Sequence, residues 1–279
     1  MTGILDAGGG MRAVYAAGVY DYLLDRGIDI KYCIGVSAGS ANQVSYIARQ
    51  RGRNAPFYTD YAFRPEYMSV RNYLKKGSYI DLEYVYAELT NEGGEYPLDY
   101  DAYAANLAEH VIVTTVAETA ETKFFSKEDM KRNAYDPIKA SSCMPMVCKP
   151  YPVDGVLYYD GGVADPIPYE KAFSDGCDKL ICIVTRPRDF RKTKMKGARV
   201  TKALMKNYPA MADALENRHI LWNAQFEAVQ KLEAEGKCLL LCPNDSCGVT
   251  SLTRNKESFR RLYAKGYVDA QAVGPFIES

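Results

Sequence analysis

The sequence predicts an α/β fold in which a mostly parallel central sheet carries helices on its faces. The first fifty residues alternate between strand and helix patterns, with apolar strands at 2–6 and 30–34, each followed by a segment of helical spacing. The alternation resumes at 179–185, an apolar stretch that reads as a buried strand. Because parallel strands need crossover helices, this order of elements predicts that the strand carboxyl ends share one edge of the sheet.

The remaining elements each have their own signal. The first helix is expected over residues 14–25, since apolar residues recur on one face and Gly27 follows its end. A helix begins at Asp136 with Pro137 at an early position, where the missing N–H breaks no hydrogen bond. The pattern also predicts strands at 110–116, 123–125 and 239–242, a hairpin at 151–159 with an Asp-Gly turn, and helices near 81–89, 99–107, 167–173, 209–235 and 256–273.

Length and composition indicate one domain with elaborations. The 279 residues show no internal repeat or linker, and we expect a core at 1–185 with a strand-and-helix extension at 186–279 packed on the same domain. The 35 basic and 35 acidic residues balance, which gives no reason to expect a nucleic-acid partner. Eight scattered cysteines without paired metal spacing indicate buried thiols of a reducing compartment. With no apolar stretch that spans a bilayer and no signal-peptide pattern, a cytoplasmic location is expected.

The stretch from Gly35 to Gly39 has the Gly-x-Ser-x-Gly pattern of a nucleophile elbow around Ser37. It lies between an apolar strand and a helical segment, as the tight strand-to-helix turn of an elbow requires. The two glycines suit positions where strand and helix come too close for a Cβ. The helix N-terminus after Ser37 also favours the negative charge that develops during acyl transfer. An ordinary Gly/Ser loop is the alternative, but the flanking elements favour a nucleophile.

The glycines Gly8, Gly9 and Gly10, directly after the first strand, have two interpretations. Consecutive glycines at a helix start expose backbone N–H groups, which suits an oxyanion hole opposite a serine nucleophile. The pattern Gly8-x-Gly10-x-x-Ala13 with Asp29 downstream also matches the dinucleotide fingerprint, so a Rossmann-type nucleotide-binding oxidoreductase is a rival. That rival does not explain why the next strand ends in a serine. A P-loop is excluded, because no Gly-Lys-Ser/Thr follows.

The base that would activate Ser37 is less obvious, because the chain has only two histidines. His110 opens a strand and His219 lies inside a long predicted helix, and neither setting is the loop of a catalytic histidine. Asp160 ends the second strand of the hairpin, ahead of two glycines that permit a tight turn. The same pattern occurs in commonplace turns, yet a carboxylate on a rigid strand end is well placed for acid–base chemistry. A Ser–Asp dyad is therefore favoured over a triad.

Two further segments have a functional and an ordinary interpretation. Residues 186–202 carry eight cations and one anion, which suits phosphate head groups or an anionic membrane surface, although a solvated loop is favoured for such a run. Residues 51–79 lack a clear period and are rich in aromatic residues, as in a lid or binding wall, or in a surface excursion.

Three segments in register resemble the patatin-like phospholipases, a family of serine acyl hydrolases. They are Gly8-Gly9-Gly10-Met11-Arg12, Gly35-Val36-Ser37-Ala38-Gly39 and Asp160-Gly161-Gly162; residues 140–145 and 165–168 look similar too. The resemblance spans roughly residues 3–185, and the tail around 217–219 and 235–237 resembles the C-terminal helical extension of bacterial members. One departure is Ala13, which stands where the family often has glycine.

The resemblance implies a three-layer α/β/α sandwich with a C-terminal helical extension, and a phospholipase or esterase that needs no metal and no cofactor. It implies Ser37 as nucleophile, Asp160 as its base and an acyl-enzyme intermediate. The expected substrate is a lipid or a small ester, with peripheral membrane contact through 186–202. A non-catalytic regulatory protein of the same fold is the remaining alternative. Backbone amides would hold the oxyanion, and they belong to Gly8, Gly9, Gly10 and Met11. The residues expected to support the motifs are Arg12, Gly35, Gly39, Gly161 and Gly162. For Arg12 three roles are open: it orients the glycine loop, it contacts a phosphate, or it forms a structural ion pair.

Overall fold

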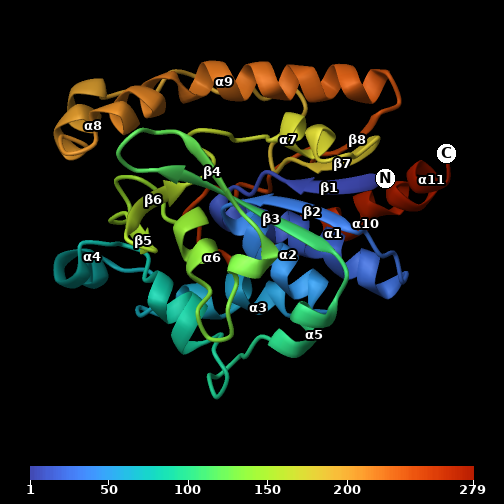
Figure 1. Ribbon diagram of the computed structural model, residues 1–279, viewed down its shortest axis with the longest axis horizontal. Helices are drawn as coiled ribbons and strands as arrows, with labels where there is room; N and C mark the ends of the chain where they lie inside the picture. The colour runs from blue at the N-terminus through green and yellow to red at the C-terminus, as the bar shows by residue number, and fades with distance from the viewer.

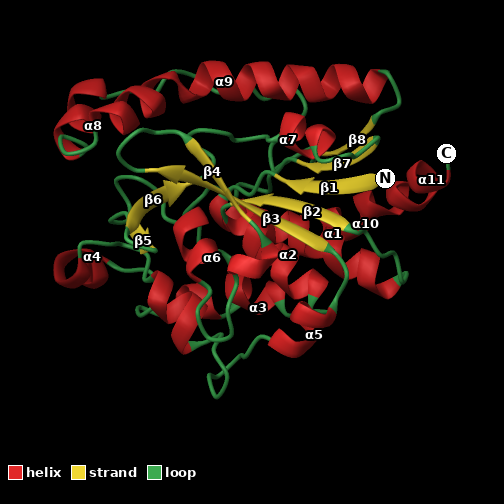
Figure 2. Ribbon diagram, viewed as in Figure 1, coloured by secondary structure: helices red, strands yellow, loops and turns green.

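An eight-stranded sheet forms the middle layer of the computed structural model, which describes residues 1–279 (Figures 1 and 2). Helices cover both faces, so the α/β sandwich expected from the sequence is confirmed. The strands are β1 (Thr2–Asp6), β2 (Tyr32–Val36), β3 (Glu109–Val116), β4 (Thr122–Phe125), β5 (Tyr151–Val153), β6 (Val156–Asp160), β7 (Lys179–Ile183) and β8 (Cys238–Leu241).

The sheet is mostly parallel, as predicted. Strands β3, β2, β1, β7 and β8 lie side by side and run in the same direction, whereas β4, β5 and β6 are antiparallel to their neighbours. The chain moves outward from β1 to β2 and β3, and later returns to place β7 on the other side of β1. The order therefore reverses between β1 and β7, and the carboxyl ends of strands at such a switch point are where open α/β sheets bind ligands.

One edge of β3 is shared by two strands that meet end to end. Strand β4 pairs with residues 112–115 along one edge of β3. Some of these β3 residues also pair with β2 and others with β6, so β2 and β6 both lie on the opposite edge. There β2 ends with Val36 opposite Val113, and β6 ends with Asp160 opposite Thr114. Because the two strands approach from opposite directions, the residue after Val36 is brought close to Asp160.

The helices form two layers whose bounds agree broadly with the sequence expectations. Below the sheet in Figure 1 lie α1 (Val14–Asp25), α2 (Ala38–Ile47), α3 (Asn54–Thr59), α5 (Tyr100–Ala105), α6 (Asp136–Ser141) and α10 (Lys256–Asp269); above it lie α7 (Tyr169–Ser174) and α9 (Pro209–Ala234). The other helices are α4 (Val70–Lys76), α8 (Ala198–Leu204) and α11 (Val273–Glu278), and Tyr84–Glu88 forms a π-helical turn. None of these helices is both long and apolar enough to cross a membrane.

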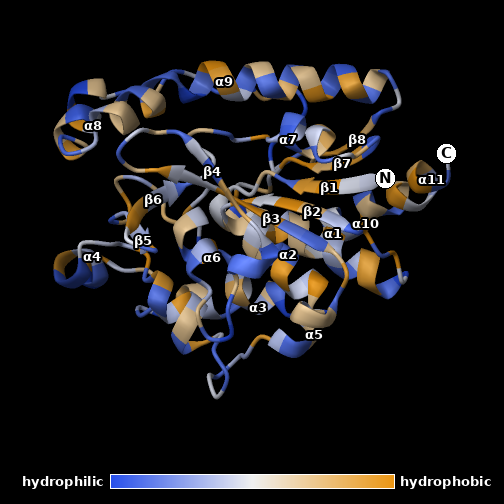
Figure 3. Cartoon of the chain, viewed as in Figure 1, coloured by the Kyte–Doolittle hydropathy of each residue, from blue (hydrophilic) through white to orange (hydrophobic).

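Alternation of side chains divides the core between the two faces of the sheet. Ile4 of β1 packs with α1 and α2, while the next residue, Leu5, packs with Trp222 and Phe226 of α9 on the opposite face. Hydrophobic bands recur along the length of α9, as expected for a helix that buries one side (Figure 3).

The C-terminal residues pack on both layers of the core. Helix α10 crosses α1 at two glycines, where a Cβ on Gly18 would lie 2.1 Å from the Tyr263 carbonyl oxygen and one on Gly266 would lie 1.9 Å from that of Tyr15. The Tyr15 hydroxyl donates a hydrogen bond of 2.7 Å to Asp269 across this contact. These contacts support the proposal that 186–279 is an extension of the same domain as 1–185.

Candidate active site

Ser37 occupies the turn between β2 and α2. Its φ of 58° and ψ of −131° place a non-glycine residue in a strained region of the backbone map, and its exposed fraction is only 7%. A Cβ at Gly35 would lie 2.5 Å from Ser40 Cα, and one at Gly39 would lie 2.4 Å from the Asp6 carbonyl oxygen. Both positions therefore require glycine for the reason that the sequence suggested. The turn holds the serine at the carboxyl end of its strand and at the N-terminus of α2.

Asp160 lies where β6 ends, next to Ser37. The carboxylate is 5% exposed and its Oδ1 accepts a 2.8 Å hydrogen bond from the Gly162 N–H. Burial raises the pKa of Asp160 above its usual value, and the Arg218 charge and the nearby Ser37 hydroxyl oppose the rise. The backbone of Gly161 packs against Val113, where a Cβ would lie 2.2 Å from a carbonyl oxygen. The result is a desolvated carboxylate that is a stronger base than an exposed one.

The structure distinguishes among the four amides expected to hold an oxyanion. The Gly8 N–H donates to Asp6 Oδ1 at 2.9 Å, and the Met11 N–H donates to the Ser251 carbonyl oxygen at 3.1 Å. The N–H groups of Gly9 and Gly10 have no acceptor within the protein. Only these two amides of the loop are free to meet a developing negative charge.

Asp6, whose role the sequence does not indicate, holds the glycine loop through a hydrogen bond from the Gly8 N–H. Its side chain is fully buried, one oxygen accepts from Gly8, and the other has no partner. Burial raises the pKa of Asp6 to about 7, so the carboxyl group is mostly protonated only below about pH 7. The signal in the sequence was a carboxylic acid at the end of an otherwise apolar strand.

Ser141 is a second residue whose role the sequence did not predict. Its Oγ accepts a 2.9 Å hydrogen bond from the Ser37 N–H and donates one of 2.7 Å to the Val113 carbonyl oxygen. This fully buried hydroxyl thus ties the nucleophile turn to β3. In the sequence, the segment 140–145 is distinguished only by its resemblance to the family.

We expect Ser141→Ala to lower kcat for ester hydrolysis by about 10–100-fold and stability by about 1–2 kcal/mol, because the strained Ser37 turn loses the acceptor that holds it. Steady-state kinetics on a p-nitrophenyl ester and thermal melting measure the two effects. Ser45→Ala is the matched control, since Ser45 is equally buried and accepts a hydrogen bond from Arg53 without touching Ser37. Equal kcat values in the two variants would show that Ser141 is only structural.

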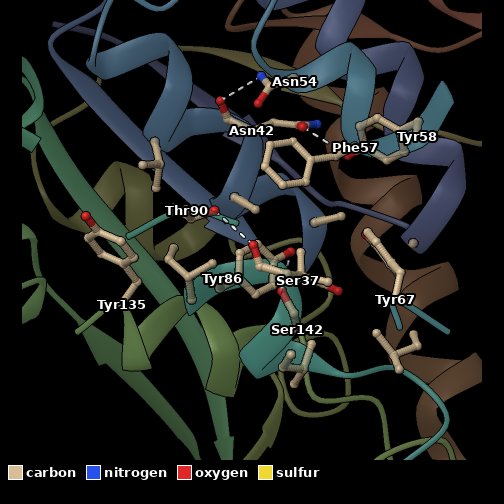
Figure 4. A pocket seen from close by; sticks show the side chains of 18 of the residues that line it. Ser37, Asn42, Asn54, Phe57, Tyr58, Tyr67, Tyr86, Thr90, Tyr135 and Ser142 are labelled. Carbon is tan, nitrogen blue, oxygen red and sulfur yellow. Dashed lines mark hydrogen bonds between the residues drawn. The ribbon is translucent and has the colours of Figure 1, made fainter. Parts of the chain in front are cut away.

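Ser37 lies on the wall shared by two cavities of opposite character. The first is apolar, with 17 hydrophobic residues among the 25 that line it, and Figure 4 shows Phe57, Tyr58, Tyr67 and Tyr86 around the same space as Ser37. The aromatic segment 51–79 thus supplies one wall of this cavity. The second cavity is a polar cleft, with 6 hydrophobic residues among 18, on the side of the glycine loop.

Neither histidine reaches this site. His110 lies at the start of β3, opposite the end that carries the site, and its Nδ1 is 3.0 Å from the Tyr103 hydroxyl. Burial lowers the pKa of His110 to about 3, which keeps the ring neutral. His219 lies on α9 with its Nδ1 against the Glu216 carbonyl oxygen, and neither ring lines the two cavities. Asp160 is the only carboxylate among the residues that line the two cavities.

The basic segment 186–202 divides into two parts. Arg188, Lys194 and Lys202 form ion pairs with acidic residues of α9. Arg186 and Lys192 instead line the polar cleft beside Ser37. The expectation of a uniformly solvated loop therefore holds for only part of this segment.

A parallel α/β sheet with an apolar cavity at its strand ends is an arrangement suited to lipid ester hydrolases. The chain belongs to the patatin-like phospholipase family, since the model described as Patatin-like phospholipase matches residues 7–173. Membership supports lipid ester hydrolysis as the general class of activity. A second model, a domain of unknown function (DUF6363), matches residues 208–275.

The chain is also similar to individual proteins. The uncharacterized protein YjjU of Escherichia coli (strain K12) is 29% identical over 187 residues, which cover 64% of this chain and 50% of YjjU. The match thus spans about half the length of this curated relative. The solved structure of VipD from Legionella pneumophila aligns with 97% of this chain and 66% of VipD, with a TM-score of 0.48 and 13% identity.

Proposed function

We propose that the protein cleaves carboxylic esters of lipids, as a phospholipase A or lysophospholipase does, through a Ser37–Asp160 dyad. The observation that carries the proposal is the end-to-end meeting of β2 and β6 on one edge of β3, which brings the serine and the aspartate together. Two further observations support the proposal: burial raises the pKa of the Asp160 carboxylate, and two amides of the glycine loop have no acceptor in the protein.

The chemistry follows from these positions. Ser37 Oγ attacks the ester carbonyl carbon while Asp160 accepts the hydroxyl proton, and the oxyanion forms against the amides of Gly9 and Gly10. Collapse of the intermediate breaks the ester bond, and Asp160 returns the proton to the departing alkoxide, leaving an acyl-enzyme. A water molecule then gives a proton to Asp160 as its oxygen attacks the acyl carbon. Asp160 passes this proton to Ser37 Oγ as the bond between Oγ and the acyl carbon breaks, which releases the fatty acid and restores both residues.

The apolar cavity suits the acyl chain of such a substrate. Its walls bring aromatic rings from α3 and from the segment that follows α4 close to Ser37 (Figure 4). Each CH₂ group buried there contributes about 0.8 kcal/mol. The alcohol part of the ester then leaves through the polar cleft on the other side of Ser37.

Two observations weigh against the dinucleotide alternative. Asp29, the acidic residue that would meet a ribose, forms ion pairs with Lys31 and Arg49. The backbone of Ser251 covers Gly10, so that a Cβ there would lie 2.6 Å from its carbonyl oxygen and no pyrophosphate can approach that face. A non-catalytic protein of this fold predicts that a fluorophosphonate probe does not label Ser37.

Peripheral membrane contact through 186–202 is part of the proposal, and the exposed residues of α8 support it. Val200 and Leu204 are 62% and 55% exposed, with Lys196 and Arg199 beside them and in no ion pair. Apolar side chains flanked by cations suit an anionic lipid surface.

The test is hydrolysis of p-nitrophenyl esters from acetate to palmitate, in solution and in vesicles with and without anionic lipid. We expect kcat/KM to rise a few-fold per added CH₂ until the cavity is full, because each buried CH₂ contributes about 0.8 kcal/mol. Anionic vesicles should raise the rate further if α8 docks on them. No hydrolysis of any ester would contradict the function, and equal rates in both kinds of vesicle would contradict the membrane contact alone.

A further inference from the structure

Three fully buried polar side chains form a cluster behind the nucleophile turn, and none of them lines either cavity. They are Asp6 of β1, Tyr20 of α1 and Gln43 of α2, and the Tyr20 hydroxyl lies close to both of the others. Each side chain has one oxygen without a hydrogen-bond partner in the protein, namely Asp6 Oδ2, Tyr20 Oη and Gln43 Oε1. Such atoms are rare in folded proteins, because their desolvation is not compensated. Three of them in one place indicate a network whose protons decide its stability.

The cluster contacts the backbone that shapes the active site. Asp6 Oδ1 accepts the hydrogen bond from the Gly8 N–H in the glycine loop at 2.9 Å. A Cβ at Gly39 would lie 2.7 Å from Asp6 Cγ, and one at Gly35 would lie 2.6 Å from Gln43 Oε1. These two glycines flank the nucleophile. Asp6 and Gln43 can therefore affect both the oxyanion amides and the serine without touching a substrate.

The number of protons available to the cluster depends on Asp6. Gln43 has a fixed orientation, because its Nε2 donates to the carbonyl oxygens of Ile4 at 3.3 Å and Ile34 at 3.0 Å. Gln43 Oε1 is then an acceptor, and an ionised Asp6 adds a second acceptor in Oδ2. The single hydroxyl proton of Tyr20 satisfies only one of them. A proton on Asp6 gives the cluster two donors for its two acceptor side chains.

The surroundings of Asp6 also favour its neutral form. Burial raises its pKa to about 7, although the Gly8 N–H and nearby polar side chains oppose the rise. The titratable groups that face Asp6 are Tyr20, Tyr58 of α3 and Cys182 of β7. Burial raises the pKa of both tyrosines well above the usual value, and a neighbouring thiol and burial do the same for Cys182, so all three stay neutral. No cation lies close enough to favour the Asp6 carboxylate.

We propose that Asp6 is a positioning residue of the active site that works as the neutral acid, and that its ionisation at alkaline pH weakens the oxyanion hole. The neutral carboxyl group holds the Gly8 N–H with one oxygen and donates a proton within the cluster from the other. Ionisation releases that proton to solvent and leaves a buried negative charge beside the loop that carries the Gly9 and Gly10 amides. This charge opposes the one that develops on the oxyanion. The assignment rests on the proposed ester hydrolysis at Ser37.

The first experiment measures hydrolysis of p-nitrophenyl butyrate against pH, with the released butyrate quantified by chromatography. We expect the wild-type kcat to fall at least about tenfold between pH 6.5 and pH 9, with little change in KM, because Asp6 lines neither cavity. Asp6→Asn cannot ionise and keeps one acceptor and one donor, so its kcat should fall less than about threefold over this range. An equal fall in the two proteins, or no fall in the wild type, would overturn the proposal.

Tyr20→Phe tests the cluster independently of any change at Asp6. The Tyr20 hydroxyl opposes the rise in the pKa of Asp6, so its removal should move the alkaline midpoint about half a pH unit higher. Tyr46→Phe is the matched control, since Tyr46 packs on Tyr20 but its hydroxyl donates to the Ile28 carbonyl oxygen and accepts from the Ile30 N–H, each at 2.9 Å. Its midpoint should equal that of the wild type. Equal midpoints in both variants would contradict the role of the cluster.

Infrared difference spectra between pH 6 and pH 9 follow the proton without requiring catalysis. Ser37→Ala should lose a protonated-carboxyl band as the pH rises, and the added Asp6→Asn change should remove that band from the difference. Ester hydrolysis by the wild type without an Asp6 band would overturn the role of Asp6 and leave the proposed function intact. An Asp6 band in a wild type that hydrolyses no ester at any pH would overturn the proposed function, and the positioning role with it.

Discussion

Ser37→Ala is expected to lower kcat for ester hydrolysis by at least about a thousandfold, the largest loss of any single change in the chain. The variant keeps the Cβ and the fold but lacks the oxygen that bonds to the acyl carbon, and other site groups cannot replace a missing nucleophile. Steady-state kinetics on a p-nitrophenyl ester measure the loss. Labelling by a fluorophosphonate probe should disappear in parallel, since the probe reports the nucleophile itself.

A second substitution at the same residue distinguishes chemistry from folding. The φ of 58° at Ser37 strains any side chain with a Cβ, so Ser37→Gly is expected to be inactive yet more stable than Ser37→Ala by about 1 kcal/mol. Thermal melting of the two variants measures the difference. Retained probe labelling in Ser37→Ala would place the nucleophile at another serine and contradict the dyad.

Some parts of this site could be predicted from the sequence because they depend only on residues that are neighbours in the chain. A serine between a strand and a helix, with Gly35 and Gly39 at the crowded positions, needs only neighbouring residues to define its turn. The parallel sheet likewise follows from the alternation of strands and helices. The family membership inferred from three motifs in register is confirmed by the match over residues 7–173.

The parts that depend on distant contacts could not be predicted. Nothing in the hairpin sequence indicates that β6 pairs on the same edge of β3 as β2, which is what brings Asp160 toward Ser37. The sequence does not distinguish the Met11 amide from its neighbours, because its acceptor, the Ser251 carbonyl oxygen, lies 240 positions later in the chain. The two inward cations of the basic segment were likewise indistinguishable from the exposed ones, because their position depends on how α9 packs above the sheet.

Asp160→Asn is expected to lower kcat about a thousandfold, because an amide of the same shape cannot accept the Ser37 proton. The Gly162 N–H keeps its acceptor, since the side-chain oxygen remains. Asp165→Asn is the matched control: burial raises the pKa of Asp165 to about 6, it accepts a 2.7 Å hydrogen bond from Gln225, and it lines neither cavity. Its kcat should equal that of the wild type.

The pH dependence separates a base from a structural carboxylate. Burial raises the pKa of Asp160 above the usual 3.8, so the wild-type kcat/KM should fall as the pH drops through a midpoint above that value. The same burial lowers the stability of the folded state at every pH above about 4, because the side chain is ionised in the unfolded chain there and its charged form is disfavoured in the folded protein. Asp160→Asn should therefore melt no lower than the wild type at pH 8, even though it has lost its activity. A variant that retains more than a tenth of kcat, or one that loses activity and melting temperature together at pH 8, would contradict Asp160 as the base.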